Sequence, residues 1–207
     1  MDRSASSGFT LMEIVVVLGI IVVLAAMLLP VFSSVRANGH KVACLSQVKQ
    51  LLEASSLYAS DNNRRLVPAR APGGGKLGTT WCVALQPYLK SKQILICPLD
   101  EAPQTVANSA DLPHSYGINY DLTFQTGYGI SNLSYAMSAI PRTADLLLFF
   151  DMKSTAAAMG SSYTANRVSR VETRHGKYTV TGWLDGHAKP MKPADLNSSR
   201  VWNPTIP

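Results

Sequence analysis

The hydrophobic positions of this chain are concentrated in one block near the N-terminus. Residues 14–29 read IVVVLGIIVVLAAMLL, with no polar side chain among them. With residues 9–13, the block supplies about the 20 residues that a membrane-spanning helix requires. A secretory signal peptide has a shorter apolar region, about 7–15 residues, followed by a small-residue cleavage site, whereas here the small residue, Gly8, precedes the block. The pattern therefore predicts a transmembrane helix over residues 9–33.

After residue 33 the apolar positions recur at steps of three and four residues, which is the spacing of one buried stripe on a helix. The stripe consists of Cys44, Leu45, Val48, Leu51, Leu52 and Tyr58. Pro30 and Gly39 are positions where the helix can kink or melt. We predict an amphipathic helix over residues 34–61, which continues the apolar helix and ends at a turn-forming Asp-Asn-Asn sequence.

Residues 62–207 predict a single head domain of α+β type. Residues 177–184 are rich in β-forming side chains, and Asp185-Gly186 directly after them is a strong hairpin turn because glycine tolerates positive φ. Residues 146–150 predict an apolar central strand. Glycines and prolines in the first half of the head predict long loops. We expect a small antiparallel sheet packed on the amphipathic helix.

The charge of the chain is unevenly distributed. The formal net charge is +6, and residues 1–35 contain only Asp2, Arg3 and Glu13 as charged groups, so the positive surplus lies beyond them. Three basic groups follow the apolar block, namely Arg36, His40 and Lys41. The positive-inside rule alone therefore does not favour a cytoplasmic N-terminus. The bases of the head are scattered, so nucleic acid is not expected as a partner.

The N-terminal sequence SSGFTLMEIVVVLGIIVVLAAMLLP resembles the prepilin family of type IV pili and type II secretion systems. A polar leader ends in Gly8, Phe9 follows, and Glu13 precedes an apolar helix that reaches Pro30. The resemblance implies that a membrane-embedded aspartyl peptidase removes leader residues 1–8 and that Phe9 is then N-methylated. Gly8 and Phe9 would be substrate positions, while Phe9, Glu13 and Pro30 would belong to the assembly helix.

Later segments resemble the secretion pseudopilins of the same family. These segments are CLSQVKQLLEASSLYASDNNRRLVPA, WCVALQPYLKSKQILICPLDE, SYGINY, RTADLLLFFD and RHGKYTVTGWLDGHAKPMK. In the last of them, His175 is followed by nine residues and then Asp185-Gly186, which is the spacing of the processing-associated H-X9-DG domain, here residues 175–186. The resemblance implies a pilin fold, with a long N-terminal helix packed on a small antiparallel sheet.

Glu13 needs a partner if it lies in the membrane, because a carboxylate inside the hydrocarbon costs roughly 2.5–3.5 kcal/mol. Cleavage after Gly8 would supply the amine of Phe9, with a reference pKa of about 7.7–8.0. Residues four apart share a helix face, and in a bundle the amine of one subunit can reach the carboxylate of the next. The alternative is a glutamate at the headgroup level of an ordinary anchor.

The three cysteines are Cys44, Cys82 and Cys97. A disulfide is chemically permitted if the head lies outside the cytoplasm. Because the related proteins tend to carry cysteines at the positions of Cys44 and Cys97, the resemblance favours that bond, with Cys82–Cys97 as the local alternative. The sequence has no CxxC and no Cys/His metal spacing, so zinc is not expected.

Two further constellations concern the head. In an extended strand, His175 and Asp185 would lie ~33 Å apart, so a structural role is expected for them and catalysis is not. Asp185, His187, Asp151 and Asp100 are candidate oxygen and nitrogen ligands of a cation, and the resemblance to major pseudopilins suggests calcium. No cofactor is required by this interpretation.

The resemblance implies a structural subunit, a pilin or pseudopilin, of a type IV pilus-like or type II secretion filament, without enzymatic activity. Its partners would be copies of itself in a helical filament, the prepilin peptidase, an inner-membrane assembly platform, minor pilins or pseudopilins and, before assembly, the lipid bilayer. It would be a single-pass precursor in the bacterial inner membrane and then part of an extracytoplasmic filament. Two alternatives stay open: a membrane-tethered extracytoplasmic binding domain or enzyme with an uncleaved anchor, and a DNA-uptake pilin.

Overall fold

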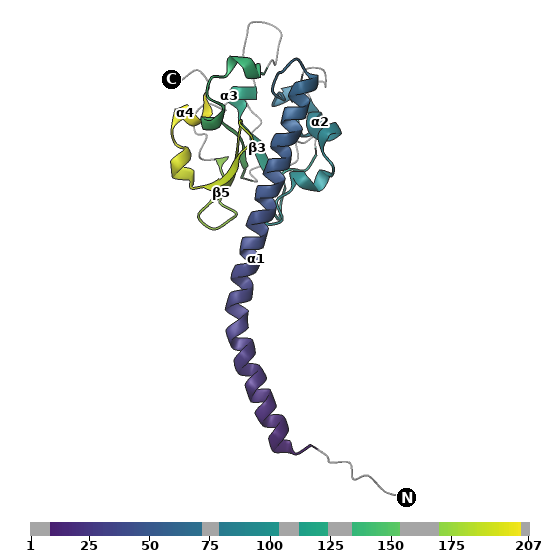
Figure 1. Ribbon diagram of the computed structural model, residues 1–207, viewed down its shortest axis with the longest axis vertical. Coiled ribbons are helices and arrows are strands. Elements are labelled where there is room, and N and C mark those ends of the chain that lie inside the picture. The colour runs from purple at the N-terminus through teal and green to yellow at the C-terminus, as the bar shows by residue number, and fades with distance from the viewer. Residues whose placement is uncertain (1–8, 72–78, 104–111, 124–133, 154–169, 204–207) are drawn as a thin grey trace, which may run out of the picture. The chain divides into compact units, whose positions relative to one another are not determined.

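The computed structural model describes residues 9–71, 79–103, 112–123, 134–153 and 170–203 (Figure 1). The chain divides into two compact units, residues 1–39 and 40–207. The helices are α1 (Leu11–Asp61), α2 (Trp81–Leu85), α3 (Tyr120–Thr123) and α4 (Ser199–Trp202), and the strands are β1 (Arg70–Ala71), β2 (Thr79–Thr80), β3 (Tyr116–Ile118), β4 (Leu147–Asp151), β5 (Thr179–Trp183) and β6 (Ala188–Met191). Short 3-10 helices occupy Gln86–Tyr88, Lys92–Leu95, Met137–Ala139, Thr143–Asp145 and Pro193–Leu196.

Within the first unit, α1 begins with a capping box. The backbone N–H and the hydroxyl of Thr10 both donate to Glu13 Oε2, each at 2.9 Å, and the Glu13 N–H donates to Thr10 Oγ1 at 3.3 Å. In this arrangement the side chains of the N-cap and third helical residues satisfy each other's backbone donors. Helix formation from Leu11 onward is thus promoted by local chemistry as well as by the apolar block.

The same part of α1 exposes apolar side chains on every side. No described side chain from Phe9 to Leu29 is buried. Among the described residues, α1 is the one helix long and apolar enough to cross a membrane. Its length and composition are those of a membrane anchor, which the unbroken apolar block predicts, or of a signal sequence. The helix passes Pro30 and Gly39 without interruption, so the predicted weak points do not break it.

The second unit is built on a four-stranded antiparallel sheet, in the order β3-β4-β5-β6, and also contains a two-stranded antiparallel sheet, β1-β2. The apolar strand predicted over residues 146–150 is β4, and residues 177–184 contain β5. These two strands are central, and all their residues are buried. Gly186, with φ of +96°, lies in the turn between β5 and β6, so the hairpin predicted at Asp185-Gly186 is confirmed.

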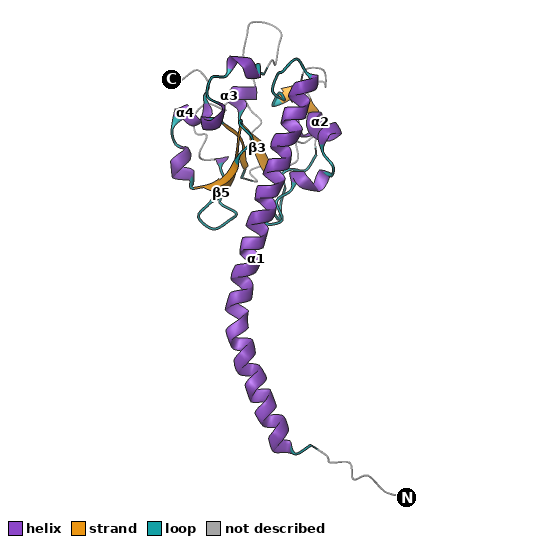
Figure 2. Ribbon diagram, in the orientation of Figure 1, coloured by secondary structure: helices purple, strands orange, loops and turns teal. Residues whose placement is uncertain are grey.

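The C-terminal part of α1 packs on this sheet (Figure 2). Its buried stripe shares one core with residues from β3, β4 and β5; the α1 members are Cys44, Val48, Leu51, Leu52 and Ala54. The α+β fold class predicted from the sequence is therefore confirmed. α1 packs closely against β5 at Gly182, where an added Cβ would lie 2.6 Å from Val48 Cγ1 and 3.1 Å from Leu52 Cδ1.

The other face of the sheet has a smaller core of its own. Leu147, Phe150 and Trp183 pack there with Leu196 and Trp202 from the C-terminal segment. Neighbours of these residues in β4, Leu148 and Phe149, face the α1 side instead. Strict alternation is interrupted because the register between β4 and β5 shifts between Leu147 and Phe149, as a β-bulge does.

Gly182→Ala should destabilise the head, because its methyl group would overlap with Val48 and Leu52. Overpacking of this kind costs about 1–3 kcal/mol of unfolding free energy. The measurement is urea unfolding of the full chain in detergent, followed by fluorescence of Trp81, Trp183 and Trp202, which are all buried in the head.

The matched control for this substitution is Gly39→Ala, since an added Cβ at Gly39 meets no atom within 4 Å. Alanine is favoured over glycine inside a helix by about 0.8–1.0 kcal/mol, so the control should be neutral or mildly stabilising. Equal unfolding free energies for Gly182→Ala and the unsubstituted chain would contradict the close packing of α1 on β5.

Candidate functional site: a buried cluster of thiol, imidazole and carboxylate groups

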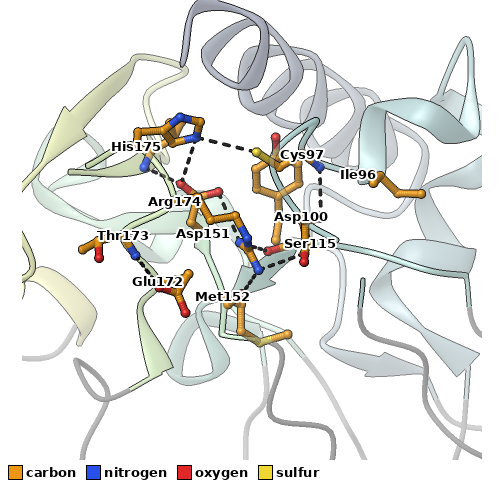
Figure 3. Close-up of polar contacts among 12 residues, drawn as sticks. Ile96, Cys97, Asp100, Ser115, Asp151, Met152, Glu172, Thr173, Arg174 and His175 are labelled. Carbon is orange, nitrogen blue, oxygen red and sulfur yellow. Dashed lines mark hydrogen bonds and ion pairs between the residues drawn. The ribbon is translucent and has the colours of Figure 1, made fainter. Parts of the chain in front are cut away.

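Four chemically reactive side chains meet in the interior of the head. Cys44 comes from α1, Cys97 from the turn after a 3-10 helix, Asp151 from the end of β4, and His175 from the segment before β5. Figure 3 shows Cys97, Asp151 and His175 pointing toward one another. Cys44, Cys97 and Asp151 are fully buried, and the side chain of His175 is 1% exposed.

The imidazole of His175 is the centre of the group. Its Nε2 lies 3.6 Å from Cys97 Sγ and 3.7 Å from Asp151 Oδ2. The two sulfur atoms and an imidazole nitrogen of His175 all lie within 4.8 Å of one another. Tyr116 closes the side toward α1, where its hydroxyl donates to Gln47 Oε1 at 2.7 Å.

Backbone hydrogen bonds hold two of these residues in place. The Cys97 N–H donates to Ser115 Oγ at 2.9 Å, and the Asp100 N–H donates to the Cys97 carbonyl at 2.9 Å. These bonds fix the Cys-Pro-Leu-Asp turn. Asp151 Oδ2 accepts the Val180 N–H at 2.8 Å, so its carboxylate joins the ends of β4 and β5.

Arg174 supplies the positive charge next to the cluster. Its Nη2 lies 2.8 Å from Asp100 Oδ2, and its Nη1 lies 3.7 Å from Asp151 Oδ1. The guanidinium also donates to the carbonyl oxygens of Ser115 and Met152. Since both carboxylates and the guanidinium are almost completely buried, the three charged groups depend on one another for compensation.

This environment changes the proton affinity of the thiols and of the carboxylate. A hydrogen bond with Cys97, followed by burial, raises the pKa of Cys44. The hydrogen bond from Cys44 lowers the pKa of Cys97, and His175 adds to the effect. Burial raises the pKa of Asp151 to about 7. Cys97 is therefore the group on which a thiolate is most readily formed, and thiolates bind metals and act as nucleophiles.

Two polar atoms of the cluster lack a hydrogen bond, although Arg174 Nη1 lies 3.7 Å from one of them, Asp151 Oδ1. Asp151 Oδ1 and His175 Nδ1 are buried and have no hydrogen-bond partner among the described residues. Buried polar atoms without partners are uncommon in folded proteins, and each calls for an explanation such as an ion.

The four residues considered for calcium do not form one site. Asp100 and Asp151 face Arg174. Asp185 lies beyond the opposite end of β4, where Leu184 N–H bonds to Leu146, and it contacts His187 Nδ1 at 2.6 Å. Partial burial tends to raise the pKa of Asp185, but hydrogen bonds from His187 lower it below its ordinary value.

The same geometry separates His175 from Asp185, as the length of the strand predicts. Asp185 lies in the turn between β5 and β6, whereas His175 pairs with Tyr178 before β5 begins. His175 lies at the strand entry, as expected, but its contacts with Cys97 and Asp151 were not predicted.

All three cysteines are free thiols in this structure, with Cys82 in the core of the head. The expected Cys44–Cys97 bond is not formed, although the two sulfur atoms lie side by side. The spacing in sequence did not reveal that Cys44, Cys97 and His175 come together from three distant segments as a group that could hold a metal ion.

The predicted processing and assembly positions are described in part. Gly8 lies outside the described residues, and so does the side chain of Pro30. Phe9 is described and is 83% exposed. Glu13 takes part in the capping box, a role that the Thr-x-x-Glu pattern signals and that the sequence analysis missed.

Comparisons with known proteins find no match for this chain among protein-family models, curated proteins or solved structures. The functional interpretation of the buried cluster and of the N-terminal processing and assembly positions therefore depends on the chemistry of their own residues.

Arg174→Met should destabilise the head strongly, since it leaves the carboxylates of Asp100 and Asp151 buried without their cation. Breaking a buried ion pair in this way costs about 3–5 kcal/mol. Asp100→Asn in the same chain should recover part of the loss because it removes one unpaired charge. Urea unfolding of the full chain measures both effects.

The control is Lys92→Met, which removes an exposed base and should change the unfolding free energy by less than about 0.5 kcal/mol. An Arg174→Met chain as stable as the control would show that Arg174 does not compensate the two carboxylates.

Proposed function

We propose that this chain is a structural subunit, a pilin or pseudopilin, of an extracytoplasmic filament of the type IV pilus or type II secretion kind. The observation that carries the proposal is the change of environment along α1. Residues 11–29 expose apolar side chains all round, whereas the stripe that begins at Cys44 is buried in the head. A lipid bilayer or a bundle of identical helices is an acceptable environment for the first part, and water is not.

The assembly that we propose places the first part of α1 in the bilayer before polymerisation and among neighbouring subunits afterwards. Partners would be copies of this chain, the prepilin peptidase, an inner-membrane platform and minor subunits. The sequence resemblance at Gly8, Phe9 and Glu13 supports this choice over a head domain on a simple anchor, since an anchor has no need of these residues. A DNA-uptake pilin would require DNA binding that weakens steeply with salt.

Glu13 sets the register between subunits in this proposal. Apolar packing alone does not dictate how smooth helices stack, because lipid and neighbouring helices are similar environments. A carboxylate that pairs with the Phe9 amine of a neighbour would select one alignment. Misalignment would leave both charges unpaired in a medium of low dielectric constant, where each ion costs several kcal/mol.

Maturation should yield a chain that begins at N-methylated Phe9. Mass spectrometry of the N-terminal peptide, taken from assembled material in a host with a prepilin peptidase, measures this directly. Gly8→Val should leave the precursor uncleaved in the membrane, because the leader would no longer offer a small residue at the junction. Assembled subunits that retain Met1 would contradict the processing step.

Glu13→Leu and Glu13→Gln should both reduce the number of filaments by about tenfold or more. A loss of roughly 1.4 kcal/mol of assembly free energy per subunit changes the assembly equilibrium by this factor. Both variants should insert in the membrane and keep a folded head, since neither changes the second unit. Filaments are counted by electron microscopy, and immunoblots of the membrane fraction measure the amount of protein.

The capping box requires its own control, because Glu13 also binds Thr10. Glutamine can take the place of glutamate in a capping box, so Glu13→Gln removes the charge and keeps the cap. Thr10→Ala removes part of the cap and keeps the charge. We expect abundant filaments from Thr10→Ala and few from Glu13→Gln; the reverse order would assign Glu13 to helix capping alone.

A further inference from the structure

We propose that the head holds one zinc ion between Cys44 Sγ, Cys97 Sγ, His175 Nε2 and a carboxylate oxygen of Asp151. This inference is independent of the filament proposal, since it concerns only residues of the second unit. On binding, the two thiols release their protons to solvent, and the ion is held by two thiolates, a neutral imidazole and a carboxylate.

The distances agree with the edges of a tetrahedron. For Zn–S bonds of about 2.3 Å and Zn–N bonds of about 2.0–2.1 Å, tetrahedral geometry separates sulfur from nitrogen by about 3.5 Å and nitrogen from oxygen by about 3.4 Å. Cys97 Sγ lies 3.6 Å from His175 Nε2, and that nitrogen lies 3.7 Å from Asp151 Oδ2. Cys44 completes a group whose sulfur and nitrogen atoms all lie within 4.8 Å.

The donor set selects the kind of metal and the kind of site. Two sulfur donors and an imidazole suit zinc, whereas calcium and magnesium take oxygen ligands. All four residues are buried, which leaves no ligand position open to solvent for a substrate. Structural zinc sites are closed in this way, and catalytic ones keep a position for water. We therefore assign a structural role to the ion.

The residues around the cluster fit a charged centre. Asp151 is oriented by the Val180 N–H at 2.8 Å. Arg174 lies 3.7 Å from the same carboxylate and 2.8 Å from Asp100, so its positive charge offsets part of the negative charge of the thiolates and carboxylates around a divalent ion. Hydrogen bonds to metal-binding side chains, such as the one from Val180, orient these side chains and tune their affinity for the metal.

A disulfide between Cys44 and Cys97 would use the same two sulfur atoms, but it would employ only two of the four groups. The imidazole of His175 and the carboxylate of Asp151 would then lie buried beside an uncharged sulfur pair. A zinc ion gives each of the four side chains a bond. It also cross-links α1 to the three segments that carry Cys97, Asp151 and His175.

The test is the metal content of the full chain, extracted from membranes in mild detergent without chelator or reductant and measured by plasma mass spectrometry. We expect one zinc ion per chain. After denaturation with a chelator and no reductant, thiol titration should find three thiols. Zinc-free protein with a single thiol would establish the disulfide and overturn the proposal.

Substitutions locate the ion. Cys44→Ser, Cys97→Ser and His175→Gln should each lose the zinc, while Cys82→Ser, which changes a buried cysteine outside the cluster, should keep it. Zinc retained in the three cluster variants would overturn the assignment.

Cobalt substitution of the unsubstituted chain does not depend on the folding of variants. Bound Co²⁺ should give a sulfur-to-cobalt charge-transfer band and the strong visible bands of a tetrahedral site. The Cys82→Ser chain should give the same spectrum. If the reduced full chain takes up neither Zn²⁺ nor Co²⁺, or shows no thiolate band, the proposal is wrong.

Discussion

The arrangement of the head depends on the burial of one stripe of α1 against the sheet. Val48, Leu51 and Leu52 are buried in the larger core, and each such side chain contributes about 1.5–3 kcal/mol when it leaves water. Gly182 allows α1 to approach β5 at this point, since any side chain there would overlap with Val48 and Leu52. Because Cys44 lies one helical turn before Val48, the same packing brings a thiol to the ends of β4 and β5.

The polar cluster follows from that placement. Once α1 is seated, Cys44 meets Cys97, and β4 ends in Asp151 beside His175. Such groups are costly in an apolar interior unless charges are compensated and donors are paired. Arg174, Ser115 and the Val180 N–H provide part of this compensation, and the proposed zinc ion would provide the rest. Packing and chemistry in the head are thus coupled through α1.

The elements that the sequence predicts well are those with a strong local signal. The apolar block, the periodic stripe after residue 40, the apolar strand β4 and the Asp-Gly turn after β5 each carry their own pattern, and the structure contains all four. The capping box of Thr10 and Glu13 also has a local signal, the Thr-x-x-Glu pattern. It was not predicted because Glu13 was interpreted only as a charge that needs a partner. The functional interpretation of Gly8, Phe9 and Glu13 depends on resemblance and remains a proposal.

The cluster could not be predicted because its members are distant in sequence. No short sequence spacing links Cys44, Cys97, Asp151 and His175. They are brought together only by the topology of the sheet and by the packing of α1 on it. The same topology separates Asp185 from Asp151, two residues that sequence reasoning grouped as ligands of one cation. Strand register, which depends on the bulge between Leu147 and Phe149, is likewise a property of the folded sheet.

The proposed filament requires that α1 polymerise through its exposed apolar part. Immunogold electron microscopy of cells that express the full chain, with an antibody against the head, tests it most directly. We expect gold particles in rows along filaments outside the inner membrane. Gold confined to the membrane, in cells whose prepilin peptidase processes other substrates, would contradict it.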